Sequence, residues 1–214
     1  MSMTLNKERK SYIHFIRHGL TEGNTRRWYY GWTDLPLLPE GVEALKGLRD
    51  AGIYPPLADA DCYTSGMLRT EQTFQTIYGD VPHEVLPLMK EMNFGLCECR
   101  TFDEMKTMDF FDDWINDRTG TIAYPEGDSV ETFHQRIRQG LKELLGYHRL
   151  KELSHRHDGQ DAISILVCHG GVIAACMETM FSGERANFWE WIPDPGHGYT
   201  VYFKDSEPER YDTF

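Results

Sequence analysis

The sequence predicts an α/β protein, specifically a three-layer α/β/α sandwich with a mostly parallel central sheet. Short apolar runs alternate with segments of helical periodicity along the 214 residues, and this alternation is typical of a parallel sheet covered by helices. The run AISILVC at 162–168 is apolar throughout, as expected of a strand buried on both faces. The length suits a single domain, which we assign to residues 1–214.

The first half of the chain contains three expected strands and two expected helices. A helix over 39–51 begins near Pro39 and is ended by Gly52. A second helix, over 66–78, has Ser65 as its N-cap. The expected strands cover 11–16, 59–65 and 83–88.

The second half opens on an irregular, acidic and aromatic segment at about 95–127. We interpret it as a lid or specificity segment with a helix near 102–116. A long helix over 129–147 follows, with Asp128 and Glu131 as a capping-box pattern at its start. Its apolar stripe indicates a structural role. The remaining elements are a strand over 162–168, a helix over 172–181 and a strand over 198–203.

The composition limits the classes of function. Lysine and arginine number 22 against 34 aspartates and glutamates, a net charge of −12, whereas a nucleic-acid binder normally has the opposite balance. We find no apolar run of about 20 residues, no basic surface helix and no secretory signal. Neither nucleic acid nor membrane is therefore an expected partner. Five irregularly spaced cysteines fit a reducing compartment, so we expect a cytoplasmic location; the sequence indicates no oligomeric state.

Charged and imidazole side chains follow several expected strands at the point where each strand ends. Ligands of such sheets bind outside the carboxyl ends of the strands. We therefore expect two arginines, two histidines and one carboxylate to converge on one pocket. These residues are Arg17, His18, Arg69, Glu91 and His169.

Each of these residue types suits the chemistry of a phosphate ester. Arginines give bidentate donors that match phosphate oxygens. A histidine beside arginines is driven toward its neutral form, and neutral imidazole can attack phosphorus. A protonated carboxyl group can donate to a leaving oxygen. Gly170 and Gly171 open a helix whose free N–H groups favour an anion.

Two other clusters invite a metal-site interpretation. Cys97 and Cys99 have no matching histidine or cysteine pair at zinc spacing, so free thiols are expected. The HRHD run at 155–158 is interpreted as part of a solvated loop. The sequence therefore predicts no metal site.

Four motifs in order give the chain a family resemblance. RHGLTEGN at 17–24, YTSGMLRTEQT at 63–73, EMNFGLCE at 91–98 and VCHGG at 167–171 resemble the successive motifs of the histidine phosphatase superfamily, also called phosphoglycerate mutase-like. The resemblance runs from about residue 12 to 203. It implies phosphoryl transfer on a small-molecule phosphomonoester, without a metal or other cofactor.

The resemblance also implies a role for each residue of the expected pocket. His18 corresponds to the nucleophile that accepts the phosphoryl group. Arg17, Arg69 and His169 correspond to the clamp on the phosphate. Glu91 corresponds to the proton donor for the leaving group, and then to the base for the attacking water.

Further positions complete the expected substrate-binding set. Asn24 matches a family position that contacts the phosphoryl group, and Thr21 a loop residue beside it. Gly19 and Gly170, which follow the two histidines directly, belong to the same set. Leu20 departs from the family, where many members have Glu or Gln, and we expect altered loop contacts there.

Two features leave alternatives open. His197 contacts substrate or caps a loop. The aromatic run RWYYGW within 26–32 forms a wall of the pocket, or packs a loop onto the body.

The expected activity is that of the phosphatase branch, in which α-ribazole and broad-specificity phosphatases have this length. Mutases of the family have a basic insertion, whereas the matching region here is acidic. A neutral or weakly charged leaving group therefore fits best. A bisphosphoglycerate-dependent mutase and a non-catalytic phospholigand-binding module stay open as alternatives. The charged residues of the region are Asp109, Asp112, Asp113 and Asp117 against Lys106 and Arg118.

Overall fold

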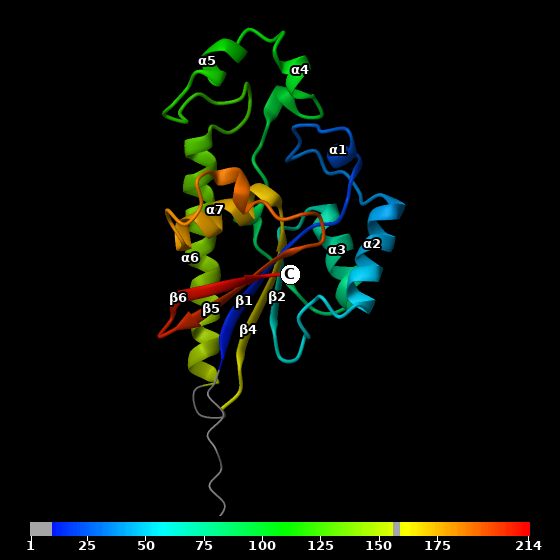
Figure 1. Ribbon diagram of the computed structural model, residues 1–214, viewed down its shortest axis with the longest axis vertical. Helices are drawn as coiled ribbons and strands as arrows, with labels where there is room; N and C mark the ends of the chain where they lie inside the picture. The colour runs from blue at the N-terminus through cyan, green and yellow to red at the C-terminus, as the bar shows by residue number, and fades with distance from the viewer. Residues whose placement is uncertain (1–9, 156–158) are drawn as a thin grey trace, which may run out of the picture.

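The central sheet has six strands (Figure 1) in a computed structural model that describes residues 10–155 and 159–214. Their order across the sheet is β3-β2-β4-β1-β5-β6. The first four are mutually parallel, while β5 is antiparallel to β1 and β6 to β5. The strands are β1 (Ser11–Arg17), β2 (Asp61–Thr64), β3 (Glu84–Val85), β4 (Ala162–Cys168), β5 (Gly198–Lys204) and β6 (Glu207–Thr213).

Helices cover both faces of the sheet, which confirms the predicted three-layer α/β/α class. In Figure 1, α2 (Pro39–Asp50) and α3 (Leu68–Tyr78) lie on one side of the strands, and α6 (Val130–Ser154) and α7 (Gly170–Met180) on the other. The shorter helices are α1 (Glu22–Thr25), α4 (Phe102–Met105) and α5 (Phe111–Ile115), with 3₁₀ turns η1 (Pro87–Met89), η2 (Gly95–Cys97) and η3 (Phe188–Trp191).

The buried strand β4 shows why this sheet needs two helical layers. Ile165 and Val167 belong to the core that includes residues of α2 and α3. Leu166 and Cys168 belong to the core that includes residues of α6 and α7. Alternate side chains of an apolar strand thus enter opposite cores, as a continuous apolar run requires.

The start of α3 differs from the prediction. Met67, in an extended conformation, is the N-cap, and the helix begins at Leu68. The predicted cap, Ser65, was wrong because Gly66 turns the chain with a φ of 78° before the helix starts. The Ser65 hydroxyl instead contacts His169.

The start of α6 was also predicted one residue early. Ser129 is the N-cap, and its hydroxyl accepts from the backbone N–H of Thr132 at 3.1 Å. The predicted pair Asp128 and Glu131 does not form the capping box, because Ser and Thr occupy the N-cap and N3 positions. The helix also runs beyond the expected 129–147.

Two short elements and one edge strand differ from the prediction. The helix expected near 102–116 is two helices, α4 and α5. The strand expected over 83–88 is shortened because Pro87 begins the turn η1. Strand β6 was missed because its sequence, EPERYDT, is polar; Asp205 and Ser206, both at positive φ, make the hairpin turn.

The register of β1 and β4 determines where the expected site residues meet. Arg17 pairs with Cys168, and the backbone N–H of His18 donates to the Cys168 carbonyl at 3.0 Å. His18 and His169 therefore emerge side by side, with ring centroids 5.4 Å apart. Helices α4 and α5 stand beyond this edge of the sheet, at the top of Figure 1.

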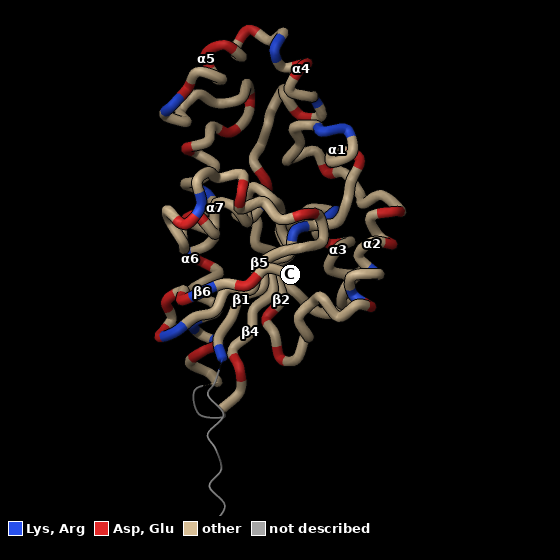
Figure 2. Tube along the Cα trace, viewed as in Figure 1, with Lys and Arg blue, Asp and Glu red and all other residues tan. Residues whose placement is uncertain are grey.

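The segment 95–127, which we call the cap, has a small core of its own. Its buried members are Cys97, Met105, Phe111 and Tyr124. Figure 2 shows acidic residues along both the cap and the body. None of the helices among residues 10–155 and 159–214 has the length and apolar character that crossing a membrane requires.

Candidate active site

His18 lies at the floor of a cavity and has a defined tautomer. Its side chain is 3% exposed, and its Nδ1 lies 2.7 Å from the carbonyl oxygen of Gly19. A carbonyl can only accept, so Nδ1 carries the proton and Nε2 keeps a free lone pair. Burial, followed by the charges of Arg69 and Arg17, holds the pKa of His18 well below its ordinary value. The ring is therefore neutral at physiological pH, and its role as the nucleophile stays a prediction.

Arg17 brings a permanent positive charge to the same cavity. Its Nη1 donates to the carbonyl of Pro193 at 2.7 Å. The buried Nε has no hydrogen-bond partner in the described part of the chain. Burial lowers the pKa of this guanidinium, but arginine stays charged in proteins. Arg17 thus keeps donor capacity for an anion beside His18.

Arg69 is fully buried and is held from three directions. Its Nη2 donates to the Gly31 carbonyl at 2.7 Å and its Nη1 to the Thr33 carbonyl at 3.2 Å. Its Nε donates to Nδ1 of His169 at 3.2 Å. A guanidinium has five N–H groups, so two have no partner among these contacts; Arg69 itself is absent from the cavity lining, and its role as a phosphate clamp stays a prediction.

His169 is the N-cap of α7 and is also fully buried. Because Arg69 donates to its Nδ1, the ring proton lies on Nε2, which donates to the Ser65 hydroxyl at 2.8 Å. The Thr70 hydroxyl, 3.1 Å from Ser65, donates in turn to the Met67 carbonyl. Burial, then the nearby Arg69, holds the pKa of His169 well below its ordinary value. This imidazole is neutral as well.

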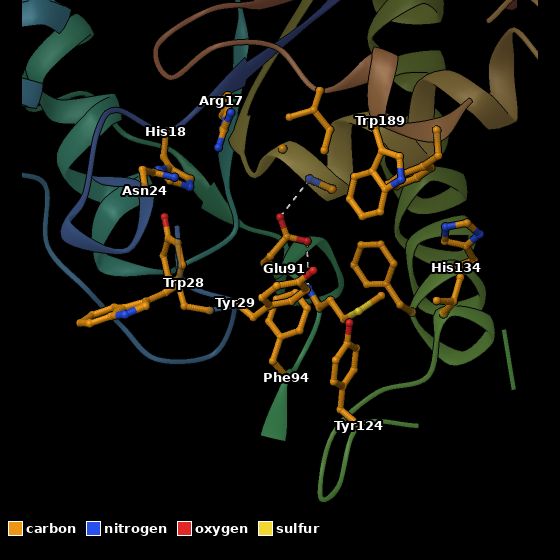
Figure 3. A pocket seen from close by; sticks show the side chains of 18 of the residues that line it. Arg17, His18, Asn24, Trp28, Tyr29, Glu91, Phe94, Tyr124, His134 and Trp189 are labelled. Carbon is orange, nitrogen blue, oxygen red and sulfur yellow. Dashed lines mark hydrogen bonds between the residues drawn. The ribbon is translucent and has the colours of Figure 1, made fainter. Parts of the chain in front are cut away.

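Glu91 faces the first turn of α7 across the cavity (Figure 3). Its Oε2 accepts from the Gly171 N–H at 3.0 Å and its Oε1 from the Met92 N–H at 2.9 Å. The guanidinium of Arg136 donates to the Glu91 carbonyl at 3.0 Å and to the carboxylate of Asp128 at 2.9 Å. The carboxyl group of Glu91 is therefore fixed at the cavity wall by backbone contacts on both sides.

The four expected substrate-binding residues are placed at different depths. Asn24 and Gly170 line the cavity. Thr21 and Gly19 are buried outside its lining. Thr21 donates through N–H and hydroxyl to Oδ1 of Asn24 at 3.0 and 2.9 Å, so the amide N–H groups of Asn24 are left for a ligand. The substrate-binding roles themselves stay predictions.

The structure favours one of the two alternatives both for His197 and for the aromatic run at 26–32. His197 donates from Nδ1 to the Phe214 carbonyl at 3.0 Å and is absent from the cavity lining, which favours a loop-capping role. Trp28, Tyr29 and Tyr30 line the cavity, which favours the pocket-wall role.

Only some of the residues considered as possible metal ligands lie within the described chain. Residues 156–158 of the HRHD run lie outside it, and His155 contacts Asp59 at 3.1 Å. Within the described ranges, no three or more His, Cys, Asp or Glu residues form a metal-binding group. The absence of a metal from the reaction stays a prediction.

The helix predicted over 129–147 packs into the core, as expected, and residues near its start also line the cavity. Val130, Phe133 and His134 of α6 line the cavity, and Arg136 holds the Glu91 segment. The apolar stripe that predicted core packing cannot distinguish a core side chain from a cavity wall, because both are apolar.

The cavity as a whole has a polar end and an aromatic end. It measures about 440 Å³, and Arg17, His18, Asn24 and Glu91 gather at one end (Figure 3). The aromatic residues of the lining are Trp28, Tyr29, Tyr30, Phe94, Trp114, Tyr124, Phe133, Phe188 and Trp189.

One edge of this mostly parallel sheet thus brings together two neutral histidines, two arginines and a carboxylate, a set that suits phosphoryl transfer. The family model described as "Histidine phosphatase superfamily (branch 1)" matches residues 13–211. The chain therefore belongs to the histidine phosphatase superfamily, as its motifs predicted.

Relatives within this superfamily include phosphatases and mutases. Adenosylcobalamin/α-ribazole phosphatase of Salmonella typhimurium is 24% identical over 185 residues, 85% of each chain. Human 6-phosphofructo-2-kinase/fructose-2,6-bisphosphatase 4 is 27% identical over 186 residues, which are 86% of this chain but only 36% of that longer protein. Other relatives are named phosphoglycerate mutases. The structure of an α-ribazole phosphatase from Shigella flexneri superposes with a TM-score of 0.71 at 21% identity, covering 92% of this chain and 93% of that one.

Proposed function

We propose that the protein is a phosphomonoester hydrolase that works, without a metal, through a phosphohistidine on His18. The observation that carries this proposal is the neutral His18 ring, with its free Nε2, beside Arg17 and Glu91. In the first step a bond forms between Nε2 and phosphorus, and the bond from phosphorus to the leaving oxygen breaks. The protonated carboxyl of Glu91 gives its proton to that oxygen.

The second step returns the enzyme to its starting state. Water attacks phosphorus while the Glu91 carboxylate takes its proton, and the bond between phosphorus and Nε2 breaks to release inorganic phosphate. Arg17, in the cavity lining, balances the charge on the phosphoryl oxygens, and Arg69 adds positive charge from its buried position beside His169. Gly171, whose N–H donates to Oε2 of Glu91, fixes the position of this carboxyl group at the cavity wall.

The charge distribution supports hydrolysis over the mutase alternative. Arg17 is the only lysine or arginine in the cavity lining drawn from the described residues. A phosphoglycerate carboxylate or a second phosphate would meet no cation there, and burying an unpaired charge is costly. The partner that fits is a small phosphomonoester with an uncharged leaving group. Five free cysteines support a cytoplasmic location.

The test is phosphate release from a panel of phosphomonoesters in EDTA by the wild type and by His18→Ala. We expect release by the wild type alone, with a loss of about 10⁴-fold or more in the variant. Acid-labile, base-stable phosphate should be trapped on the wild type during turnover. Turnover without trapped phosphate would contradict the intermediate. Exchange between phosphoglycerates would identify a mutase, and tight binding without turnover a binding module.

A further inference from the structure

The aromatic end of the cavity narrows the class of ester that the protein takes, an inference that rests on the function proposed above. We propose that the natural substrate is a small-molecule phosphomonoester whose leaving group is a large, uncharged aromatic alcohol. It would lie in what we call the aromatic chamber, formed by Phe94, Tyr124 and Trp189 (Figure 3) together with Trp114 and Phe133.

The walls of the chamber come from two parts of the chain. Phe94, Trp114 and Tyr124 belong to the cap and the turn that leads into it, with Phe94 and Trp114 5.0 and 5.3 Å from Tyr124 between ring centroids. Phe133 lies on α6 in the body. Edge-to-face and tilted packing is the geometry in which aromatic rings attract one another, so these rings give the cavity a lining that favours an aromatic group.

Size and charge both favour a bulky neutral group. A cavity of about 440 Å³ holds more than a phosphate, and it falls within the range of small-molecule sites. Glu91 is the only carboxylate and Arg17 the only Lys or Arg in the lining contributed by the described chain. Acidic residues recur over the cap (Figure 2) and further disfavour a second anionic group.

The exposed position of Trp189 is not explained by the proposed catalytic residues. It is 71% exposed, more than any other large apolar residue of the described chain, and yet it lines the cavity. An exposed indole gains burial when an apolar group covers it. A ring in the chamber would cover this indole and be held between it and the cap.

His134 supplies a polar group without a charge. Its ring lies 5.4 Å from Phe188, tilted by 34°, and lines the same cavity. Burial lowers the pKa of His134, so the imidazole is neutral and offers one N–H and one acceptor. A heteroatom or hydroxyl on the aromatic leaving group would form a hydrogen bond with His134.

The test compares three esters whose leaving oxygens are all alkyl, so that leaving-group basicity does not bias the result. These are 2-(1-naphthyl)ethyl phosphate, propyl phosphate and 3-phosphoglycerate. For the wild type we expect kcat/KM to be about 100-fold higher for the naphthylethyl ester than for propyl phosphate, and lowest for 3-phosphoglycerate. Trp189→Ala should lower the naphthylethyl value about tenfold through KM, and the propyl value no more than about twofold.

Controls make the outcome specific to the chamber. Trp189→Phe should restore most of the naphthylethyl value, and Leu150→Ala, which removes another exposed apolar side chain, should change neither ester. Equal rates on the naphthylethyl and propyl esters, or equal losses on both in Trp189→Ala, would overturn the inference. A kcat/KM on a phosphotyrosyl peptide well above the value on free phosphotyrosine, which has the same leaving oxygen, would replace the small molecule with a protein substrate. Failure to hydrolyse any ester would instead refute the proposed function.

Discussion

The polar and aromatic ends of the cavity are built by different forces. At the polar end, directional hydrogen bonds to backbone atoms hold Arg69 and Glu91. At the aromatic end, Tyr29 packs against Phe94 and Tyr124 through ring contacts of 5.4 and 6.4 Å. The first end recognises a group common to all phosphate esters, while the second can distinguish among them. Changes at the polar end should therefore affect every ester, and changes at the aromatic end only bulky ones.

Among the residues that do not contact the substrate, we expect substitution of Glu98 to lower kcat/KM the most. Its carboxylate accepts from the N–H groups of Gly31, Trp32, Thr33 and Phe94 at 2.9–3.0 Å. The carbonyls of that same loop hold Arg69. Glu98→Gln places an NH₂ group against N–H donors and loses charge-assisted bonds worth about 1.5–3 kcal/mol each. We expect kcat/KM to fall about 50-fold, by the same factor for propyl and naphthylethyl phosphates.

A matched variant in the cap separates this effect from simple loss of a carboxylate. Glu104 accepts from the Thr101 N–H at 2.7 Å, but the bond closes a helix cap and does not reach the loop that holds Arg69. Glu104→Gln should leave the rates on both esters unchanged. A loss in Glu98→Gln confined to the naphthylethyl ester would contradict the division between the two ends.

Substitution of Gly171 should lower activity less than substitution of Glu98. It tests Glu91 as the proton donor and not the residues that bind the phosphate. A Cβ at this position would come within 2.5 Å of Oε1 of Glu91. The carboxyl is the tip of a flexible side chain, so the fold should persist while the acid moves away from the leaving oxygen. We expect Gly171→Ala to slow alkyl esters about tenfold, and 4-nitrophenyl phosphate, whose leaving group needs no proton, much less.

Gly146 provides the control for this substitution. No heavy atom lies within 4 Å of a Cβ built there, in the middle of α6. Gly146→Ala should retain full activity and stabilise the helix by about 1 kcal/mol. If Gly171→Ala slowed 4-nitrophenyl phosphate as much as the alkyl esters, Glu91 would not be the proton donor.

Three of the expected site residues could be predicted to lie close together because they stand at strand ends. Parallel strands end at one edge, so Arg17, His18 and His169 had to meet there. The anchoring role of Glu98 was missed, since three of its four partners are backbone N–H groups of a loop more than sixty residues away. Backbone donors have no signature in the sequence, so only the folded arrangement shows them.

The aromatic end could be predicted only in outline. The 26–32 run was predicted either to form a pocket wall or to pack a loop, and the cap was predicted to be a lid or specificity segment; Tyr29 and Trp114 line the cavity. The positions of Phe133 and His134 in the cavity wall were not predicted, because an apolar stripe on a helix has the same sequence pattern whether it faces a core or a cavity. Trp189 lies on the turn η3, which has no periodic pattern to place it.

The smallest expected effect is on the stability of the protein at acid pH, where the histidines of the two ends should contribute differently. Burial lowers the pKa of both His18 and His134, but His18 is fully buried and its pKa is held much lower. Unfolded histidines titrate near 6.5, so between about pH 6.5 and 5 the unfolded chain binds protons that the folded protein does not. Stability is therefore complete above about pH 6.5 and falls with acid, by about 1.4 kcal/mol per pH unit for each such proton. Urea unfolding across this range should show a shallower acid slope for His18→Asn than for His134→Asn, and equal slopes would show that the two ends bury their imidazoles alike.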